Sequence, residues 1–291
     1  MPADKPTPGL YLLATPIGAA KDITLHCLEL LASLDILVAE DTRVLRKLMD
    51  IHGISLDGRQ MKSYHDHSKA GEREWILDQI AQGKSVGYAS DAGTPMIADP
   101  GFDLVRDAYE RGFTVEVAPG ASALTAAIAL SGLPSDRVYF GSFLPSKSGA
   151  RQKTLENIAA LEASLVFYES PKRVIACLED MMKIFGPERA VALCREITKK
   201  FQQIARGSLL DVHTIMSQQE TIKGEIVLVL GPPLKKEVSE AEIRELLTPM
   251  LQKMSTKAAS QSLAEQLNLP RKQIYSLALD IKNDSSRSSD A

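Results

Sequence analysis

The chain has 291 residues, of which 44% are hydrophobic and 24% charged, and its formal net charge is −3 at pH 7. This composition is typical of globular proteins, and the length predicts two domains with small appendages. A negative net charge excludes an overall attraction to nucleic acid, so any RNA contact must come from local basic patches. The beginning of the chain lacks the apolar stretch of a signal peptide, and no apolar run approaches the ~18 residues that span a membrane. We therefore expect a cytoplasmic protein.

Strand-like and helix-like segments alternate over residues 9–134, which follow a flexible leader predicted for residues 1–8. Asp22 is predicted to cap the first helix. The predicted strands are 9–14, 35–38, 61–64, 86–89 and 114–118. Such alternation is the signature of a mostly parallel α/β sheet. We therefore predict an N-terminal α/β domain over 9–134.

The same alternation continues to residue 233, with a basic loop, containing Lys147, Arg151 and Lys153, after the first strand. The predicted strands are 137–144, 164–168, 190–194 and 224–230, and residues 201–223 are expected to be irregular. This pattern predicts a second, C-terminal α/β domain over 135–233.

A helical appendage is predicted over 240–282, and residues 283–291 are expected to be a flexible tail. Between Thr256 and Lys282 the apolar residues follow a helix-turn-helix pattern, with Lys257, Arg271 and Lys272 near the turn. This arrangement suits nucleic-acid binding, and it suits a small structural helical cap equally well.

Metal and disulfide sites are not indicated. Cys27, Cys177 and Cys194 are odd in number and lack paired spacing, so we expect three buried thiols. His65 and His67 have no cysteine or third histidine nearby, so hydrogen bonding within a loop is favoured over metal ligation.

The stretch from Val86 to Gly101 is the first candidate for a binding loop. An apolar strand ends in S-D-A-G-T-P at 90–95, and Asp99 and Pro100 are expected to cap and begin the next helix. In open α/β sheets, ligands bind outside the carboxyl ends of the strands. The alternative is an ordinary turn between a strand and a helix.

Polar residues also follow the other predicted strands. They are Thr15-Pro16, Glu40-Asp41-Thr42-Arg43, Ser90-Asp91, Glu169-Ser170, Arg195-Glu196 and Lys199. No two glycines are spaced G-x-G, so the dinucleotide-binding fingerprint is missing. If the strands are parallel, these polar ends meet at one edge of each sheet, and two such edges predict a ligand cleft between the α/β domains.

Nine short motifs make a resemblance specific. They are T-P-I-G at 15–18, A-E-D-T-R at 39–43, S-D-A-G-T-P at 90–95, D-P-G at 99–101, P-G-A-S-A at 119–123, F-L-P at 143–145, F-Y-E-S-P-K-R at 167–173, R-E-I-T-K at 195–199 and G-E-I-V-L at 224–228. Over residues 9–231 the chain closely resembles the tetrapyrrole-methylase superfamily, and within it the ribosomal RNA small-subunit methyltransferase I branch. The helical tail resembles the C-terminal part of that branch.

The resemblance implies a class III methyltransferase fold, with S-adenosylmethionine held between two α/β domains of a homodimer. It implies 2′-O-methylation of a cytidine ribose in the decoding centre of 16S rRNA, within free rRNA or the small ribosomal subunit. By position, the implied cofactor-binding residues are Thr15, Pro16, Ser90, Asp91, Ala92, Gly93, Thr94, Pro95, Ser122, Ala123, Phe143 and Leu144. Ala19 and Ala20 depart from the Asn-Leu that usually follows T-P-I-G in the family.

The candidate catalytic residues follow from the chemistry of a ribose hydroxyl, which is a poor acid and benefits from a nearby base. The candidates are Glu40, Asp41, Glu169, Glu196 and Lys199, the lysine on condition that burial lowers its pKa. Glu169 and Lys199 are favoured. The candidate RNA-binding residues are Arg43, Lys172, Arg173, Arg195 and Lys200.

Two other functions are weighed against rRNA methylation. One is methylation of a small tetrapyrrole by the same fold, which neither the helical tail nor the basic loop at 147–153 favours. The other is an RNA-binding protein whose transferase site has degenerated, which the alanines at 19–20 would fit.

Overall fold

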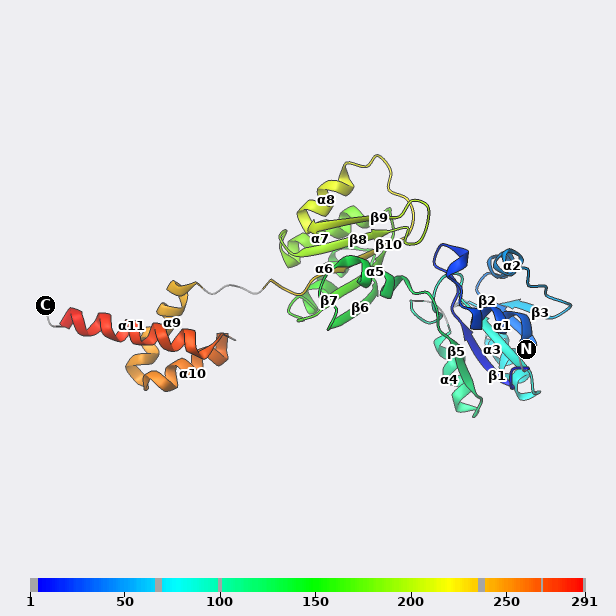
Figure 1. The fold of residues 1–291 in the computed structure, drawn as a ribbon, viewed down its shortest axis with the longest axis horizontal. Helices are drawn as coiled ribbons and strands as arrows, with labels where there is room; N and C mark the ends of the chain where they lie inside the picture. Colours follow the sequence, from blue (N-terminus) through cyan, green and yellow to red (C-terminus); the bar gives the residue numbers. More distant parts are fainter. Residues whose placement is uncertain (1–4, 66–69, 99–100, 235–238, 268, 290–291) are drawn as a thin grey trace. The chain divides into compact units, whose positions relative to one another are not determined.

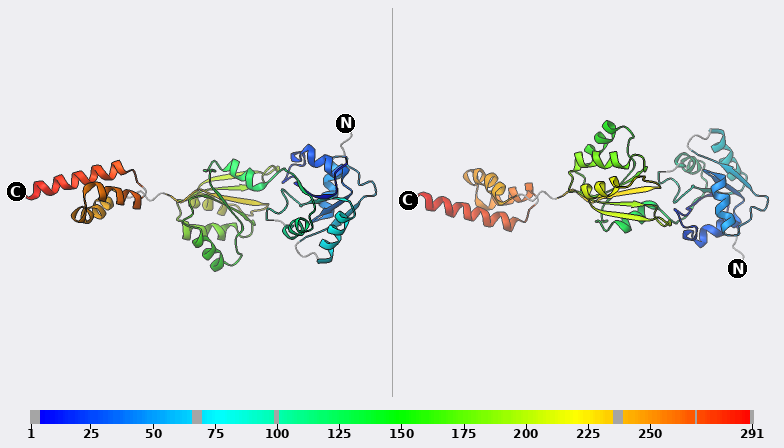
Figure 2. Two further views of the ribbon diagram at one scale, coloured as in Figure 1. Left: turned by 90° about the horizontal axis from the view of Figure 1, so that it is seen from below. Right: turned by 90° about the horizontal axis from the view of Figure 1, so that it is seen from above.

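The computed structural model describes residues 5–65, 70–98, 101–234, 239–267 and 269–289. The chain divides into two compact units, Met1–Pro233 and Leu234–Ala291. The first unit contains two five-stranded sheets with helices packed on both faces of each, and the second unit is helical (Figures 1 and 2). The predicted α/β architecture with a helical C-terminal domain is confirmed.

The first sheet is parallel throughout, as the alternation of strands and helices predicts. Its strands lie in the order β3-β2-β4-β1-β5. Their bounds are β1 Gly9–Leu13, β2 Ile36–Ala39, β3 Gln60–Ser63, β4 Ser85–Ala89 and β5 Val115–Ala118. β2 and β4 are buried along their whole length, which is expected for parallel strands covered on both faces.

Helices cover both faces of this sheet because successive strand residues point to opposite sides. Tyr11 and Leu13 pack with α1 (Leu25–Ser33) and α2 (Thr42–Ile51), whereas Leu10 packs with α3 (Ala70–Ala81) and α4 (Phe102–Glu110). The carboxyl ends of β1, β2 and β4 therefore lie at one edge, each followed by a short loop.

One predicted helix cap differs from the structure, and a second lies outside the described residues. Asp22 ends a short 3-10 helix, η1 (Ala20–Asp22), and Thr24 caps α1 by accepting the Cys27 backbone N–H at 3.2 Å. The hydroxyl is better placed because Ile23 and Thr24 are extended and α1 begins only at Leu25. Gly101, with φ of 126°, directly precedes α4, and the predicted cap at Asp99 and Pro100 lies outside the described residues.

The second sheet is mixed, in the order β6-β7-β10-β8-β9. The strands are β6 Val138–Phe143, β7 Ser164–Glu169, β8 Ala190–Arg195, β9 Gln203–Ser208 and β10 Ile226–Leu230. β6 and β7 are parallel, β10 runs antiparallel to β7 and β8, and β9 runs antiparallel to β8. The expectation of mostly parallel strands therefore holds for the first sheet alone.

The segment predicted to be irregular, 201–223, contains β9 and the helix α8 (Leu209–Ser217). β9 reads Q-I-A-R-G-S, and Ala205 is its one buried residue. It lies at the edge of the sheet, so it needs no apolar run to cover two faces, and the sequence shows none.

The second sheet is also covered on both faces. α6 (Ser148–Asn157), α7 (Val174–Phe185) and α8 pack on one face, and α5 (Ala123–Ser131) packs on the other. α5 precedes residue 134, where we place the end of the first domain, yet its apolar side chains pack on β8 and β10. Ile17, from the loop after β1, joins the same cluster.

In the basic loop predicted after the first strand of this sheet, Arg151 is buried and stabilises the fold. Arg151 is 3% exposed and donates from Nε to Asp180 at 2.9 Å. Lys147 and Lys153 are exposed. The argument that the whole loop suits RNA is therefore wrong for Arg151, because a buried partner holds its charge.

The second unit consists of α9 (Glu240–Lys253), α10 (Thr256–Leu267) and α11 (Arg271–Ser289). Leu247, Leu263, Ile274 and Ala278 are among the buried residues of their shared core. α11 continues beyond residue 282, where the predicted appendage ends. No helix in the described parts of the chain is long and apolar enough to cross a membrane. Cys27, Cys177 and Cys194 are buried, as predicted.

Candidate active site

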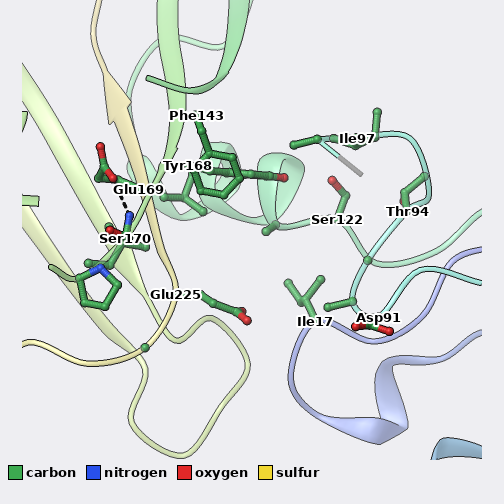
Figure 3. A pocket seen from close by; sticks show the side chains of 18 of the residues that line it. Ile17, Asp91, Thr94, Ile97, Ser122, Phe143, Tyr168, Glu169, Ser170 and Glu225 are labelled. Atoms are coloured by element: carbon green, nitrogen blue, oxygen red, sulfur yellow. Dashed lines mark hydrogen bonds between the residues drawn. The ribbon is translucent and has the colours of Figure 1, made fainter. Parts of the chain in front are cut away.

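A cavity of about 410 Å³ lies in the first unit, between loops that follow strands of the two sheets (Figure 3). Loops after β2, β4 and β5 form one wall, and the ends of β6 and β7 with the start of β10 form the other. The volume falls in the usual range for small-molecule sites. The described residues lining it are Ile17, Glu40, Asp91, Ala92, Gly93, Thr94, Ile97, Ala98, Ser122, Ala123, Phe143, Tyr168, Glu169, Ser170, Pro171, Gly224, Glu225, Ile226 and Val227.

The S-D-A-G-T-P loop is fixed from behind by its own backbone. Thr15 and Gly93 exchange two backbone hydrogen bonds of 2.9 and 3.0 Å, and Gly93 has φ of +86°, which favours glycine. The hydroxyls of Thr15 and Ser90, both buried, donate to Ser90 O and Gly93 O. Thr15 and Ser90 therefore shape the loop from below, and Ala92, Gly93 and Thr94 face the cavity.

Carboxylates from the loops after β2 and β4 lie close together in this wall. Asp91 Oδ1 accepts the Asp41 backbone N–H at 2.9 Å, and the Asp91 backbone N–H donates to Glu40 Oε2 at 3.3 Å. Asp41 itself turns to Arg43, and this guanidinium and the Arg43 backbone N–H lower the pKa of Asp41 to about 2. Glu40 and Asp91 line the cavity, whereas Asp41 caps α2.

The rest of this wall offers a helix end and apolar surface. Ser122 and Ala123 begin α5, and no side chain caps its first N–H groups. The positive end of a helix favours a negatively charged group. Ile17 and Ile97 lie nearby. On the opposite wall, Phe143 and Tyr168 stack edge to face, with ring centroids 5.6 Å apart.

Glu169 is the most deeply buried of the cavity carboxylates, at 3% exposure. Its Oε1 accepts the Ser170 backbone N–H and Arg173 Nε, each at 2.7 Å. Figure 3 shows the carboxylate turned toward Ser170, away from the space that Asp91 and Glu225 face. Burial and this carboxylate raise the pKa of the Cys177 thiol. Through these hydrogen bonds, Glu169 stabilises the F-Y-E-S-P-K-R turn.

Lys199 is held by two carboxylates at the rim. Its Nζ lies 2.9 Å from Glu196 Oε1 and 3.0 Å from Glu225 Oε2. Burial acts to lower the pKa of Lys199, but the hydrogen bonds to Glu196 and Glu225 outweigh it, so the pKa is raised. The condition under which Lys199 acts as a neutral base is therefore not met, and the side chain is an ammonium at neutral pH.

The T-P-I-G loop reaches this cluster directly. The Ala19 backbone N–H donates to Thr198 Oγ1 at 3.1 Å, and a Cβ at Gly18 would lie 2.5 Å from that oxygen. Ala20 O lies 3.0 Å from His52 Nε2. The alanines at 19–20 are thus held through backbone groups, and neither is among the described residues that line the cavity.

The candidate RNA-binding residues differ in availability. Lys172 and Lys200 are exposed. Arg43 is exposed but paired with Asp41, Arg173 is paired with Glu169, and Arg195 donates to Gln203 and Lys223 O. None of the five is among the described residues that line the cavity.

The cavity suits a cationic methyl donor. Glu40, Asp91 and Glu225 contribute carboxylates, the carboxylate of Glu169 lies behind them at Ser170 and Arg173, and no lysine or arginine is among the described residues that line it. A sulfonium and an ammonium group are favoured by such surroundings, and the free amino end of α5 suits a carboxylate. These residues therefore fit S-adenosylmethionine. In the described ranges, no three acidic, histidine or cysteine side chains are grouped to hold a metal ion.

Nine of the sequence-predicted site residues line the cavity: Glu40, Asp91, Ala92, Gly93, Thr94, Ser122, Ala123, Phe143 and Glu169. Thr15, Pro16, Ser90, Pro95 and Leu144 lie outside the lining, as do Asp41 and Lys199. Ile97, Tyr168 and Glu225 were not predicted. Glu225 belongs to the G-E-I-V-L motif, which carried the resemblance, so the motif itself was the signal.

Two family models match the chain. "Tetrapyrrole (Corrin/Porphyrin) Methylases" matches residues 9–213, and "RsmI C-terminal HTH domain" matches residues 237–282. The fold agrees: a cobalt precorrin-4 methyltransferase has a TM-score of 0.58 at 16% identity, covering 76% of this chain and 94% of its own. A Thermus thermophilus uroporphyrin-III C-methyltransferase complexed with S-adenosyl homocysteine has a TM-score of 0.54 at 20% identity, covering 77% and 97%. The chain belongs to the tetrapyrrole methylase family.

Curated relatives place it more narrowly. A ribosomal RNA small subunit methyltransferase I from Mesorhizobium japonicum is 40% identical over 285 residues, covering 98% of this chain and 96% of the relative. A protein of the same name from Synechocystis is 39% identical, covering 94% and 99%. Within the family, the chain groups with the proteins named ribosomal RNA small subunit methyltransferase I.

Proposed function

We propose that this chain transfers a methyl group from S-adenosylmethionine to the ribose 2′-hydroxyl of a cytidine in the decoding centre of 16S rRNA. The observation that carries the proposal is a cavity with acidic residues and no lysine or arginine among its described lining residues, placed where the motifs of the branch converge. When bound, S-adenosylmethionine supplies an electrophilic methyl group on a sulfonium. The relatives' names support rRNA as the acceptor.

The cofactor is proposed to lie on the wall built by the S-D-A-G-T-P loop and the amino end of α5. Asp91, Gly93 and Thr94 hold it from one side, and Phe143 faces them from the other. Positioning of the acceptor oxygen behind the methyl group supplies most of the acceleration in such a displacement. Thr15, Pro16 and Ser90 hold the loop in shape.

Glu225 and Lys199 are proposed to handle the proton of the ribose hydroxyl. The Glu225 side chain is 73% exposed, lines the cavity and lies 3.0 Å from the Lys199 ammonium. A carboxylate at that place can accept the hydroxyl proton, and the ammonium can stabilise the oxygen as negative charge develops. Glu169, the base favoured from sequence, is proposed instead to position the wall.

Conservative variants separate these two roles. Glu225→Gln is expected to lower kcat by about 100-fold, the size of a lost general base, while the Kd for S-adenosylmethionine changes by less than about threefold. Glu169→Gln is expected to lower the unfolding midpoint, with kcat of the folded fraction near wild type. The reverse pattern would restore Glu169 as the base.

The chain is further proposed to act in the cytoplasm as a homodimer, on 16S rRNA or the small subunit. These statements follow the resemblance to the branch, and sedimentation at micromolar concentration measures the oligomeric state. Lys172 and Lys200 are proposed as phosphate contacts at the rim.

Incorporation of tritiated methyl groups tests the proposed reaction. Small subunits that lack the modification are expected to take up label in a 2′-O-methylcytidine of 16S rRNA. Label in a porphyrinoid and none in RNA would identify a tetrapyrrole methyltransferase. Folded protein that gives no heat of binding with S-adenosylmethionine would identify an RNA-binding protein with a degenerate site.

A further inference from the structure

The second unit contains a hollow of about 460 Å³ lined by Lys257, Arg271, Lys272 and Tyr275, called here the basic hollow. All four residues are exposed. In the described residues, none of the three cations takes part in an ion pair of 4 Å or less with a carboxylate. Their charge is therefore available to a ligand.

The surrounding backbone adds to this positive potential. Lys257 is the second residue of α10, and Arg271 and Lys272 are the first two of α11. Each of the three cations therefore stands in the first turn of a helix, whose amino end carries partial positive charge. Convergence of three cations on two helix starts favours a polyanion.

Tyr275 indicates which kind of polyanion suits the basic hollow. It follows Arg271 by one helical turn, and its side chain is 40% exposed in the lining of the hollow. An exposed aromatic ring beside cations is the arrangement on which unpaired bases stack, whereas duplex backbones need cations alone. The hollow thus offers contacts to phosphates and to one base.

We infer that the basic hollow binds single-stranded RNA, with phosphates at Lys257, Arg271 and Lys272 and an unpaired base stacked on Tyr275. The inference rests on the proposed function, because rRNA is then the chain's substrate. The proposed function needs such an RNA-binding site, because the carboxylates that line the cavity of the first unit repel the RNA whose ribose is to be methylated there.

The test uses the full chain and a fluorescent single-stranded RNA of about 12 nucleotides, a length within the range of common single-strand sites. Lys257→Ala/Lys272→Ala is compared with Lys84→Ala/Lys253→Ala, which removes two exposed lysines that do not line the hollow. Tyr275→Leu is compared with Tyr275→Phe, which keeps a stacking ring. Circular dichroism checks folding, and calorimetry with S-adenosylmethionine checks the cavity.

The hollow variant is expected to weaken RNA binding by about tenfold and to reduce the slope of log affinity against log salt by about 1.4, since two phosphate contacts are lost. Tyr275→Leu weakens binding and Tyr275→Phe restores it, while cofactor affinity stays unchanged in all four. In methylation assays the loss falls on KM. If the RNA affinity of the hollow variant equals that of the control, the inference is wrong. If RNA binding depends on the hollow but rRNA is never methylated, the inference stands and the proposed function fails.

Discussion

Asp91 joins two strand ends and also faces the proposed cofactor. Its carboxylate accepts the backbone N–H of Asp41, and its own N–H donates to Glu40. One side chain thus fixes the register of the loops after β2 and β4 and adds a negative charge to the cavity wall. A cation bound there gains from the charge, because opposite charges attract at short distance.

Asp91→Ala is therefore expected to raise the Kd for S-adenosylmethionine by about tenfold, the value of one charge-assisted contact. Titration calorimetry measures it. Glu162→Ala is the matched control, since Glu162 is exposed and does not line the cavity. An unchanged Kd for Asp91→Ala would remove this residue from the cofactor site.

At the scale of single elements, α2 depends on a charged cap. Asp41 accepts the Arg43 backbone N–H at 2.8 Å and pairs with its guanidinium, and these contacts lower the pKa of Asp41 to about 2. Because the folded pKa lies below the unfolded value of about 3.9, the ionised form stabilises the fold above that value, and the contribution is lost as pH falls through about 2.

The stability difference between wild type and Asp41→Asn is expected to be constant from neutral pH down to about pH 5 and to shrink between about pH 4 and pH 2. Asparagine is nearly as good a cap as aspartate, so the variant isolates the charge. Urea unfolding across this range measures the difference. A gap that stays constant to the acid end would show that the Arg43 pair contributes nothing.

α6 and α7 are joined by a buried ion pair that the sequence did not reveal. Asp180 accepts from Arg151, Ser148 and Gln152, and although burial acts to raise the pKa of Asp180, these hydrogen bonds outweigh it and lower the pKa. Both side chains of the pair are 3% exposed. Loss of the carboxylate would leave the guanidinium buried without its counter-charge.

Asp180→Asn is expected to reduce the free energy of unfolding by about 3 kcal/mol, the usual cost of breaking a buried pair. Arg151→Met/Asp180→Leu removes both charges and is expected to cost less than the single variant. Chemical denaturation compares the two. A double variant that is less stable than Asp180→Asn would show that the pair contributes net stability.

The elements that could be predicted are those with local signals. Apolar runs bounded by Gly/Pro turns located nine of the ten strands, and polar residues after them located one wall of the cavity. Strand direction has no local signal. β10 runs against β7 and β8, so it brings its start, Gly224 and Glu225, to the edge where its neighbours end.

The lack of a local signal also explains why the sequence did not predict the sheet on which α5 packs. α5 is rich in alanine and apolar along its length, so its sequence does not indicate which sheet it covers. The structure packs it on the second sheet, where its amino end lines the cavity. The nine lining residues predicted from motifs lie in loops at strand or helix ends, whereas Glu225 was missed because the direction of β10 has no local signal.

At the scale of the whole molecule, the acidic cavity and the basic hollow belong to different units. The cavity of Met1–Pro233 is lined by carboxylates, and the hollow of Leu234–Ala291 by lysines and an arginine. The net charge of −3 is a sum over the whole chain and does not show this separation of charges. For that reason, composition alone argued against an overall attraction to nucleic acid. Binding of a cationic donor and binding of a polyanion are then separable functions.

Truncation after Pro233 tests that separation. Residues 17–227 supply the whole described lining of the cavity, and the two sheets have core clusters of their own. The shortened chain is therefore expected to fold and to bind S-adenosylmethionine with a Kd within about twofold of the full chain, because no charged contact to the cofactor is lost. Its KM for the rRNA substrate is expected to rise by about tenfold or more, because the phosphate contacts of the basic hollow are lost. Calorimetry and methyl incorporation measure the two quantities on one preparation. A folded truncated chain that no longer binds the cofactor would show that the helical unit takes part in the methyl-donor site itself.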